Sequence, residues 1–325
     1  MARSHVVYAG TMCVGHSERS PIFHSIDVVG LYLNPPERTC KGSADKSATA
    51  WTTTLESRAV HDVEAAVEAA TLGAKILLQY WQQLDKSDAD MKARNDWVSR
   101  ADRESETAIV AHLEHVFPND AILGEEGTKS SGSSGRTWII DPLDGTSNYL
   151  QHFPVWSISI GLMANDQIIA GVIFEPLRDL FFTAVRGGGA FRNGERIHVS
   201  DQQTVEGAFL ATGFPFRAQQ FVTIYCSIFQ DVISHAKGVR RAGSAALDLA
   251  YTAAGIFDGF FELHLSPWDV AAGSLMVTEA GGVVTDFSGG DRWFERGNIV
   301  GAPPGIHADL LALIARHVRE EQLGR

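Results

Sequence analysis

The sequence predicts a layered α/β or α+β sandwich, in which pairs of helices flank two runs of β-strands. Residues 59–81 carry apolar side chains at helical spacing, and residues 102–117 repeat that pattern. Residues 155–187 then alternate between apolar runs and turn residues, which is typical of strands. Because pairs of helices flank the two runs of strands, the helices and strands must cover one another to bury their apolar faces.

The first block contains a pair of helices followed by strands. One face of its first helix is apolar and consists of Val60, Val63, Val67, Ala70, Ala74 and Leu77. A polar stretch rich in Asp and Lys separates this helix from the second one. Residues 121–127 and 138–141 predict short strands on either side of a flexible Ser/Gly loop at 128–136. Further along, Asn193-Gly194 predicts a hairpin turn.

The second block mixes helices and strands up to the end of the chain. Its expected elements are a strand at 208–215, helices at 218–236 and 244–255, a strand at 257–263, a helix at 266–282, strands at 283–287 and 298–302, and a final helix at 307–322. Ser266-Pro267 is a typical helix start, and glycines end that helix.

The composition limits what the chain can bind. It has 325 residues, of which 45% are hydrophobic, and 27 basic against 39 acidic side chains give a net charge of −12. This balance argues against direct nucleic-acid binding, which needs a basic face. It still permits a small anionic substrate, because bound cations can reverse the local field.

We expect neither a membrane span nor a disulfide framework. No apolar run reaches the length of a span, and Cys13, Cys40 and Cys226 are odd in number and lack metal-ligand spacing. We interpret them as free thiols of a cytoplasmic protein. Residues 1–57 lack the apolar stretch of a signal peptide. We therefore expect a disordered extension, or translated sequence upstream of the true start, ahead of a folded domain at 58–325.

The segment WIIDPLDGTSNY, residues 138–149, carries the most specific chemical signal. Its apolar start predicts a buried strand, and its proline stiffens the turn that leaves the strand. Asp141 and Asp144 then face one spot, with the Leu143 carbonyl between them. Such an oxygen-rich, negatively charged cluster suits Mg²⁺.

The residues that follow could meet a phosphate. The backbone N–H groups of Gly145 and Thr146, with the threonine hydroxyl, begin the next segment, as helix starts that bind anions do. The alternative is an ordinary Asp-Gly turn in which Asp141 caps a helix.

Three further acidic sites lie beside apolar strands or helix starts. They are Asp102, the pair Glu125-Glu126, and Asp269. Each has a plain structural alternative: Asp102 as a helix N-cap, the glutamates in a solvated loop, and Asp269 as a favourable charge in a first helical turn. Together, in this order and spacing, the four sites favour a shared chemical role.

From residue 58 onward, the chain resembles the inositol monophosphatase family, and within it the bacterial branch typified by the extragenic suppressor protein SuhB. The segments that carry the resemblance are NDWVSRADRESE, GEEG, WIIDPLDGTSNY, ATGFPF, RRAGSAALDLAYTAAGIFDGFFE and SPWDVAAG. The resemblance implies the layered α-β-α-β-α sandwich of the inositol monophosphatase/fructose-1,6-bisphosphatase superfamily.

The resemblance also implies a magnesium site. Glu125, Asp141 and the Leu143 carbonyl are similar to the ligands of a first Mg²⁺. Asp141, Asp144 and Asp269 are similar to those of a second. Glu125 would also help to hold a third, loosely bound ion.

The remaining roles that the resemblance implies concern water and substrate. Asp102 and Thr146 resemble the pair that orients and deprotonates the attacking water. The implied substrate-binding residues are Asp144, Gly145, Thr146, Gly243, Ser244, Ala245, Glu262 and Asp269. Among these, Glu262 matches the residue that hydrogen-bonds substrate hydroxyls. Ser147 stands where many relatives have threonine, but it keeps a hydroxyl.

The implied function is magnesium-dependent, lithium-sensitive hydrolysis of myo-inositol monophosphate by a cytoplasmic homodimer. Alternatives within the superfamily are phosphatases acting on fructose 1,6-bisphosphate, histidinol phosphate or 3′-phosphoadenosine-5′-phosphate. An alternative of another class is a SuhB-like component of transcription antitermination complexes. In that case Arg240-Arg241 would belong to a binding surface, or simply to a subunit interface.

Overall fold

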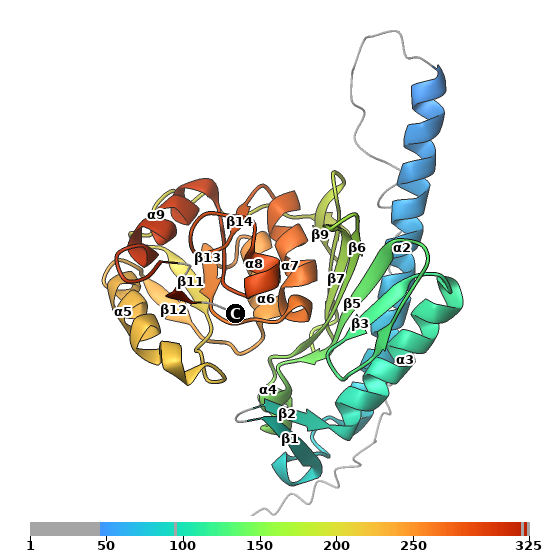
Figure 1. The fold of residues 1–325 in the computed structure, drawn as a ribbon, viewed down its shortest axis with the longest axis horizontal. Coiled ribbons are helices and arrows are strands. Elements are labelled where there is room, and N and C mark those ends of the chain that lie inside the picture. Colours follow the sequence, from blue (N-terminus) through green and yellow to red (C-terminus); the bar gives the residue numbers. More distant parts are fainter. Residues whose placement is uncertain (1–45, 94–95, 320–321, 324–325) are drawn as a thin grey trace, which may run out of the picture.

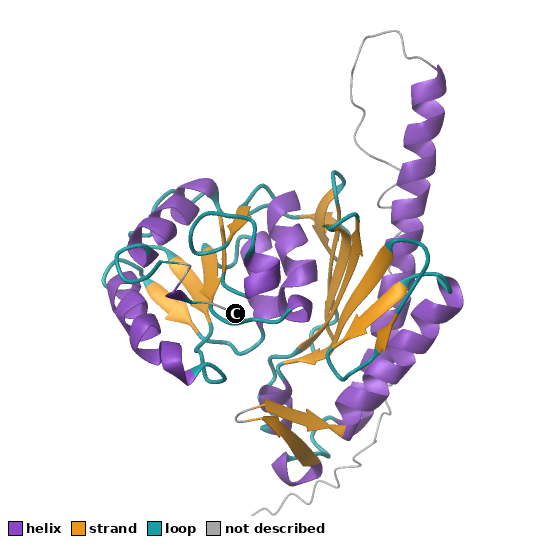
Figure 2. Cartoon of the chain, in the orientation of Figure 1, coloured by secondary structure: helices purple, strands orange, loops and turns teal. Residues whose placement is uncertain are grey.

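Five layers, in the order α-β-α-β-α, make up the protein, as the resemblance implies (Figures 1 and 2). A computed structural model describes residues 46–93, 96–319 and 322–323. Crossing Figure 1 from right to left, a helix pair, a large sheet, a second helix pair, a small sheet and a third helix pair follow one another. No helix in these described ranges is long and apolar enough to cross a membrane.

The first layer consists of α2 (Lys46–Tyr80) and α3 (Arg100–Val116), which pack against each other. The predicted apolar face of α2 is confirmed, because Val63, Ala70 and Leu77 are buried against the large sheet. The helix begins before residue 58. The rest of the predicted extension, residues 1–45, lies outside the described residues, so the boundary at 58 stays a prediction.

The large sheet has eight strands, and all neighbours are antiparallel except β3 and β5. In spatial order the strands are β10 (Glu195–Arg196), β9 (Gly189–Arg192), β8 (Leu180–Val185), β7 (Gln167–Glu175), β6 (Ser157–Ala164), β5 (Arg136–Asp144), β3 (Ala121–Gly124) and β4 (Lys129–Ser130). The predicted Asn193-Gly194 turn joins β9 to β10, and both residues have positive φ, as this hairpin turn requires.

The middle layer, α6 (Ala245–Ala253) and α7 (Pro267–Glu279), lies between the two sheets. The small sheet contains, in spatial order, β12 (Gly238–Arg240), β11 (Phe209–Thr212), β13 (Gly259–Glu262), β15 (Ile299–Ala302) and β14 (Val283–Thr285). Both middle helices are buried on nearly every side, which explains their lack of polar faces. The short helix α8 (Trp293–Arg296) contacts α7.

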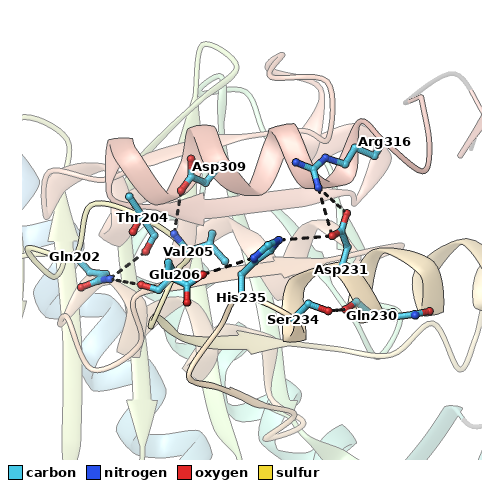
Figure 3. A network of polar contacts seen from close by, with 10 residues as sticks. All are labelled: Gln202, Thr204, Val205, Glu206, Gln230, Asp231, Ser234, His235, Asp309 and Arg316. Carbon is cyan, nitrogen blue, oxygen red and sulfur yellow. Dashed lines mark hydrogen bonds and ion pairs between the residues drawn. The ribbon is translucent and has the colours of Figure 1, made fainter.

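The last layer consists of α5 (Val222–Ile233) and α9 (Pro304–Ile314), which cover the outer face of the small sheet. Polar contacts fasten these helices to their surroundings (Figure 3). Asp309 of α9 accepts a hydrogen bond from the Val205 backbone, and Asp231 of α5 pairs with Arg316 and His235. Most of these side chains are partly or fully exposed, and their contacts fasten α5 and α9 to the neighbouring loops.

Three segments differ from the sequence-based expectation. The polar stretch after α2 contains a two-stranded sheet of β1 (Ala89–Ala93) and β2 (Asp96–Ser99). The supposed loop at 128–136 contributes β4, because β3 offers it a free edge. The final helix starts earlier, at Pro304, and ends at Ile314 instead of residue 322.

A buried ion-pair network ties α2 to the large sheet. The Arg136 guanidinium, at the start of β5, lies 2.6 Å from Asp62 of α2 and 3.1 Å from Asp120. Trp138 donates its indole N–H to the same Asp120 carboxylate. All three charged side chains are at most 6% exposed. Their charges are therefore compensated by one another and not by water.

We therefore expect Asp62→Ala to lower the free energy of unfolding by about 3 kcal/mol, because Arg136 would stay buried with half of its ion pairing lost. Urea denaturation followed by circular dichroism measures this. Glu68→Ala on the same helix is the control, because Glu68 is 68% exposed and its replacement should cost less than about 1 kcal/mol. Equal losses for both variants would contradict the interpretation.

Candidate active site

A bulge in β5 turns two aspartates toward the same side of the large sheet. Asp141 pairs with Ser159, whereas Asp144 pairs with Ser157. An advance of three residues along β5 therefore corresponds to only two residues along β6. In a regular strand, residues three apart point to opposite faces. Because Ser157 and Ser159 share a face, their partners share it too, and Pro142 sits inside the bulge, where proline is tolerated.

Two further aspartates are placed by helix starts. Asp102 is the third residue of α3, and its carboxylate accepts the backbone N–H of Ser99, the N-cap, at 2.9 Å. Asp269 occupies the third position of α7 and accepts the N–H of Ser266 at 2.6 Å. Asp102 is therefore not the N-cap, as one alternative had it, and Asp141 lies in a strand and caps no helix.

Asp141, Asp144 and Asp269 meet at one point. Each offers a carboxylate oxygen, and these atoms lie within 4.8 Å of one another. Glu125, directly after β3, lines the same cavity because β3 and β5 are parallel and end at the same edge. Leu143 also lines it, and its carbonyl oxygen accepts a hydrogen bond of 3.1 Å from the Thr146 hydroxyl.

Burial and mutual repulsion make this cluster costly to ionise. Burial, followed by the charges of Glu125 and Asp144, raises the pKa of Asp141 well above its ordinary value. Burial also raises the pKa of Asp144 to about 6, against the hydrogen bonds from Ser244 and the Ala246 N–H. Carboxylates that repel one another at this range suit one or more hard divalent cations, and the all-oxygen donor set fits Mg²⁺.

Thr146 links the cluster to Asp102. Gly145, in the left-handed conformation with φ of 98°, precedes the short helix α4 (Thr146–Leu150). The Thr146 hydroxyl lies 3.0 Å from Asp102 Oδ1 and 3.1 Å from the Leu143 carbonyl, so it donates its proton to one of them at a time. When the Thr146 hydroxyl donates its proton to Asp102, the lone pairs of the hydroxyl oxygen point away from that carboxylate.

The opposite wall of the cavity comes from the second block of the sequence. The cavity has a volume of about 450 Å³. It is lined by every predicted site residue except Asp102, including Gly243, Ser244, Ala245 and Glu262.

Glu262 can occupy its place in the cavity because Gly213 has no side chain; a Cβ at that position would lie 1.8 Å from Glu262 Oε1. Burial raises the pKa of Glu262 to about 8, against the nearby charge of Arg241. The Ser244 hydroxyl is N-cap of α6 and donates to Asp144.

Three residues of the site were missed at the sequence level. Glu106 of α3 is 3% exposed and accepts hydrogen bonds from the N–H groups of Glu126 and Thr128, at 2.7 and 3.0 Å, which fixes the turn next to Glu125. Asp248 and Arg241 line the cavity. Asp248 follows the Ser244 N-cap by one helical turn, a spacing that could have indicated its position.

A model of the inositol monophosphatase family matches residues 59–323 of this chain. The Nus factor SuhB of Escherichia coli (strain K12) is 41% identical over 248 residues, which are 76% of this chain and 93% of that protein. The Nus factor SuhB of Pseudomonas aeruginosa is 41% identical over 258 residues, or 78% of this chain and 95% of that protein.

Solved structures show the same similarity. The extragenic suppressor protein suhB from Bartonella henselae has a TM-score of 0.76 and 39% identity, covering 79% of this chain and 100% of that one. An inositol monophosphatase from Anabaena (Nostoc) has a TM-score of 0.71 and 33% identity, covering 83% of this chain and 99% of that one.

The turn held by Glu106 leads to a prediction about metal affinity. Glu106→Ala loosens the turn at Glu126 and Thr128, so the neighbouring Glu125 is oriented less firmly, and Mg²⁺ should bind about 10- to 100-fold more weakly. Isothermal titration calorimetry measures this affinity. The control is Glu104→Ala on the same helix, whose side chain is 46% exposed. Unchanged affinity in Glu106→Ala would contradict the positioning role.

A second prediction concerns pH and the metal-free protein. The folded-state pKa of Asp144 is about 6, raised from 3.8, so its contribution to stability is fully present below 3.8 and is lost as pH rises through 6. At pH 8 with a chelator, Asp144→Asn should raise the free energy of unfolding by about 1–3 kcal/mol. At pH 3, below the unfolded-state pKa of 3.8, the difference should nearly vanish. Urea denaturation across this pH range tests the prediction, and a pH-independent difference would contradict it.

Proposed function

The chain belongs to the inositol monophosphatase family, and from that premise we propose that it is a magnesium-dependent phosphomonoesterase that hydrolyses myo-inositol monophosphate. The observation that carries this proposal is the convergence of Asp141, Asp144 and Asp269 within 4.8 Å in a cavity that is also lined by Thr146, whose hydroxyl is hydrogen-bonded to Asp102 behind it. A phosphate monoester is repelled by carboxylates, so such a cavity accepts it only when cations lie between them.

Four carboxylates and one carbonyl would hold the metal: Glu125, Asp141, Asp144, Asp269 and Leu143. Two or three bound Mg²⁺ ions would supply charge stabilisation for the phosphoryl oxygens and a lower pKa for a bound water.

The chain's own residues would handle the proton of the attacking water. With its hydroxyl donated to Asp102, Thr146 presents a lone pair that can take this proton, while its own proton passes to Asp102. Burial raises the pKa of Asp102, which strengthens it as the final acceptor. The water oxygen bonds to phosphorus, the ester P–O bond breaks, and the leaving alcohol oxygen takes a proton from solvent water, while Asp102 later returns its proton to solvent. The backbone N–H groups of Gly145 and Thr146 would bind the phosphate.

The rest of the proposal concerns polyol binding, oligomeric state, cellular location and inhibition. Glu262, with Gly243, Ser244 and Ala245, would bind the polyol. We also propose a cytoplasmic homodimer that lithium inhibits by competing at a metal position.

A second candidate function is favoured by the names of the relatives. Proteins 41% identical to this chain are called Nus factors, which points to a role in transcription complexes through protein partners such as antitermination factors. The net charge of −12 speaks against direct nucleic-acid contact in that role.

The first test is phosphate release from myo-inositol 1-phosphate, with and without Mg²⁺, beside fructose 1,6-bisphosphate, histidinol phosphate and 3′-phosphoadenosine-5′-phosphate. We expect metal-dependent turnover that prefers the inositol ester. Asp102→Asn should lower kcat by about 10²- to 10⁴-fold, because the proton acceptor is lost. Asp90→Asn is the control, since Asp90 is 75% exposed and outside the cavity.

The outcomes separate the candidates. Preference for another ester would keep the site and replace the substrate. No turnover of any ester, with Mg²⁺ demonstrably bound, would favour the binding function. Rescue of a cellular loss-of-function phenotype by Asp144→Asn would also favour it, because that variant lacks a metal ligand.

A further inference from the structure

Asp248 is a buried carboxylate in the cavity for which the proposed reaction has no use. It lies on α6, one turn after Ser244, and is 1% exposed. Asp248 lines the cavity together with Asp144 and Glu262, and burial raises the pKa of its carboxyl, which the negative charges of both raise further. It therefore reaches the substrate space from a helix that also supports the metal cluster.

One oxygen of this carboxylate has no partner. Among the residues that the structure describes, Asp248 Oδ1 is the only buried carboxylate oxygen without a hydrogen bond. Other buried acids of the chain are satisfied internally: Asp286 accepts N–H groups of Ser288 and Gly290, and Glu175 accepts the Tyr251 hydroxyl. Since an unsatisfied buried carboxylate oxygen costs free energy, a ligand group that enters the cavity and donates a hydrogen bond to Asp248 would gain binding free energy.

The chemistry of the surrounding wall indicates which ligand fits. Asp248 and Glu262 supply acceptors, and the Arg241 guanidinium, 5.2 Å from the centroid of the Phe216 ring, supplies positive charge to both. A second phosphate on the substrate would face two carboxyl groups here. A neutral group with several hydroxyls instead offers each carboxyl a donor, and each hydroxyl can also accept from the guanidinium.

We propose that Asp248 determines substrate specificity by accepting a hydrogen bond from a hydroxyl of the leaving alcohol, beside Glu262. This inference rests on the proposed function and deepens it. The site selects monoesters of neutral polyols over bisphosphates and over alcohols without further hydroxyls, because only a polyol satisfies the unpaired oxygen of Asp248.

The experiment compares Asp248→Ala, Asp248→Asn and wild type on two esters in the presence of Mg²⁺. myo-Inositol 1-phosphate offers hydroxyls to Asp248, and p-nitrophenyl phosphate offers none. Asp248→Ala should lower kcat/KM about 10- to 100-fold for the inositol ester and less than about threefold for the aromatic one. Asp248→Asn keeps an acceptor oxygen and should lose less. The control is Glu175→Gln, which removes a buried charge that contacts α6 outside the cavity. It should leave the ratio of the two kcat/KM values, inositol ester over aromatic ester, unchanged.

Equal losses on both esters in the two Asp248 variants would overturn the inference and leave the proposed function intact. If wild type hydrolyses neither ester, the proposed function fails, and ligand binding decides the inference separately. In that case, thermal stabilisation of wild type by myo-inositol 1-phosphate that Asp248→Ala loses would support the role of Asp248. Absence of stabilisation in wild type would overturn it.

Discussion

The repulsion among three buried carboxylates is the constraint on which the site depends. Asp141, Asp144 and Asp269 come within 4.8 Å of one another, and burial deprives them of the water that would screen their charges. Without a cation, the chain can relieve this repulsion only by holding protons, as the raised pKa values of Asp141 and Asp144 indicate. The repulsion within the cluster therefore lowers the free energy of unfolding of the metal-free protein. A bound divalent cation would restore this stability.

The fold sustains this arrangement because each carboxylate is tied to a rigid element. A bulge between two paired strands orients Asp141 and Asp144, and hydrogen bonds from the N-cap residues hold Asp102 and Asp269 at the starts of α3 and α7. These elements belong to different layers, and apolar clusters on both faces of the large sheet lock those layers together. Precise placement of the charges thus depends on packing far from the cavity.

The two walls of the cavity come from different parts of the chain and serve different purposes. The edge of the large sheet and the start of α7 supply the candidate cation-binding oxygens. Glu262 comes from β13, Asp248 from α6, and Arg241 from the loop between β12 and α6. Such a division would allow substrate-contacting residues to change while the candidate metal site stays the same. The same division is compatible with relatives named for transcription, since a protein surface for partners can change without touching the metal-binding edge.

The sequence by itself determined the layered fold and singled out the acids that are candidates for cation binding. Helical and strand periodicities are local signals, and the acids stand directly beside strand ends and helix starts, so both were predictable. Only the tertiary structure decided that Asp141 and Asp144 share a face, because this depends on their pairing with Ser159 and Ser157 of another strand. It also decided the roles of Glu106 and Asp248. The surroundings of both residues are formed by segments distant in sequence. No local pattern therefore predicts which buried carboxylate receives hydrogen bonds within the fold and which keeps an oxygen without one.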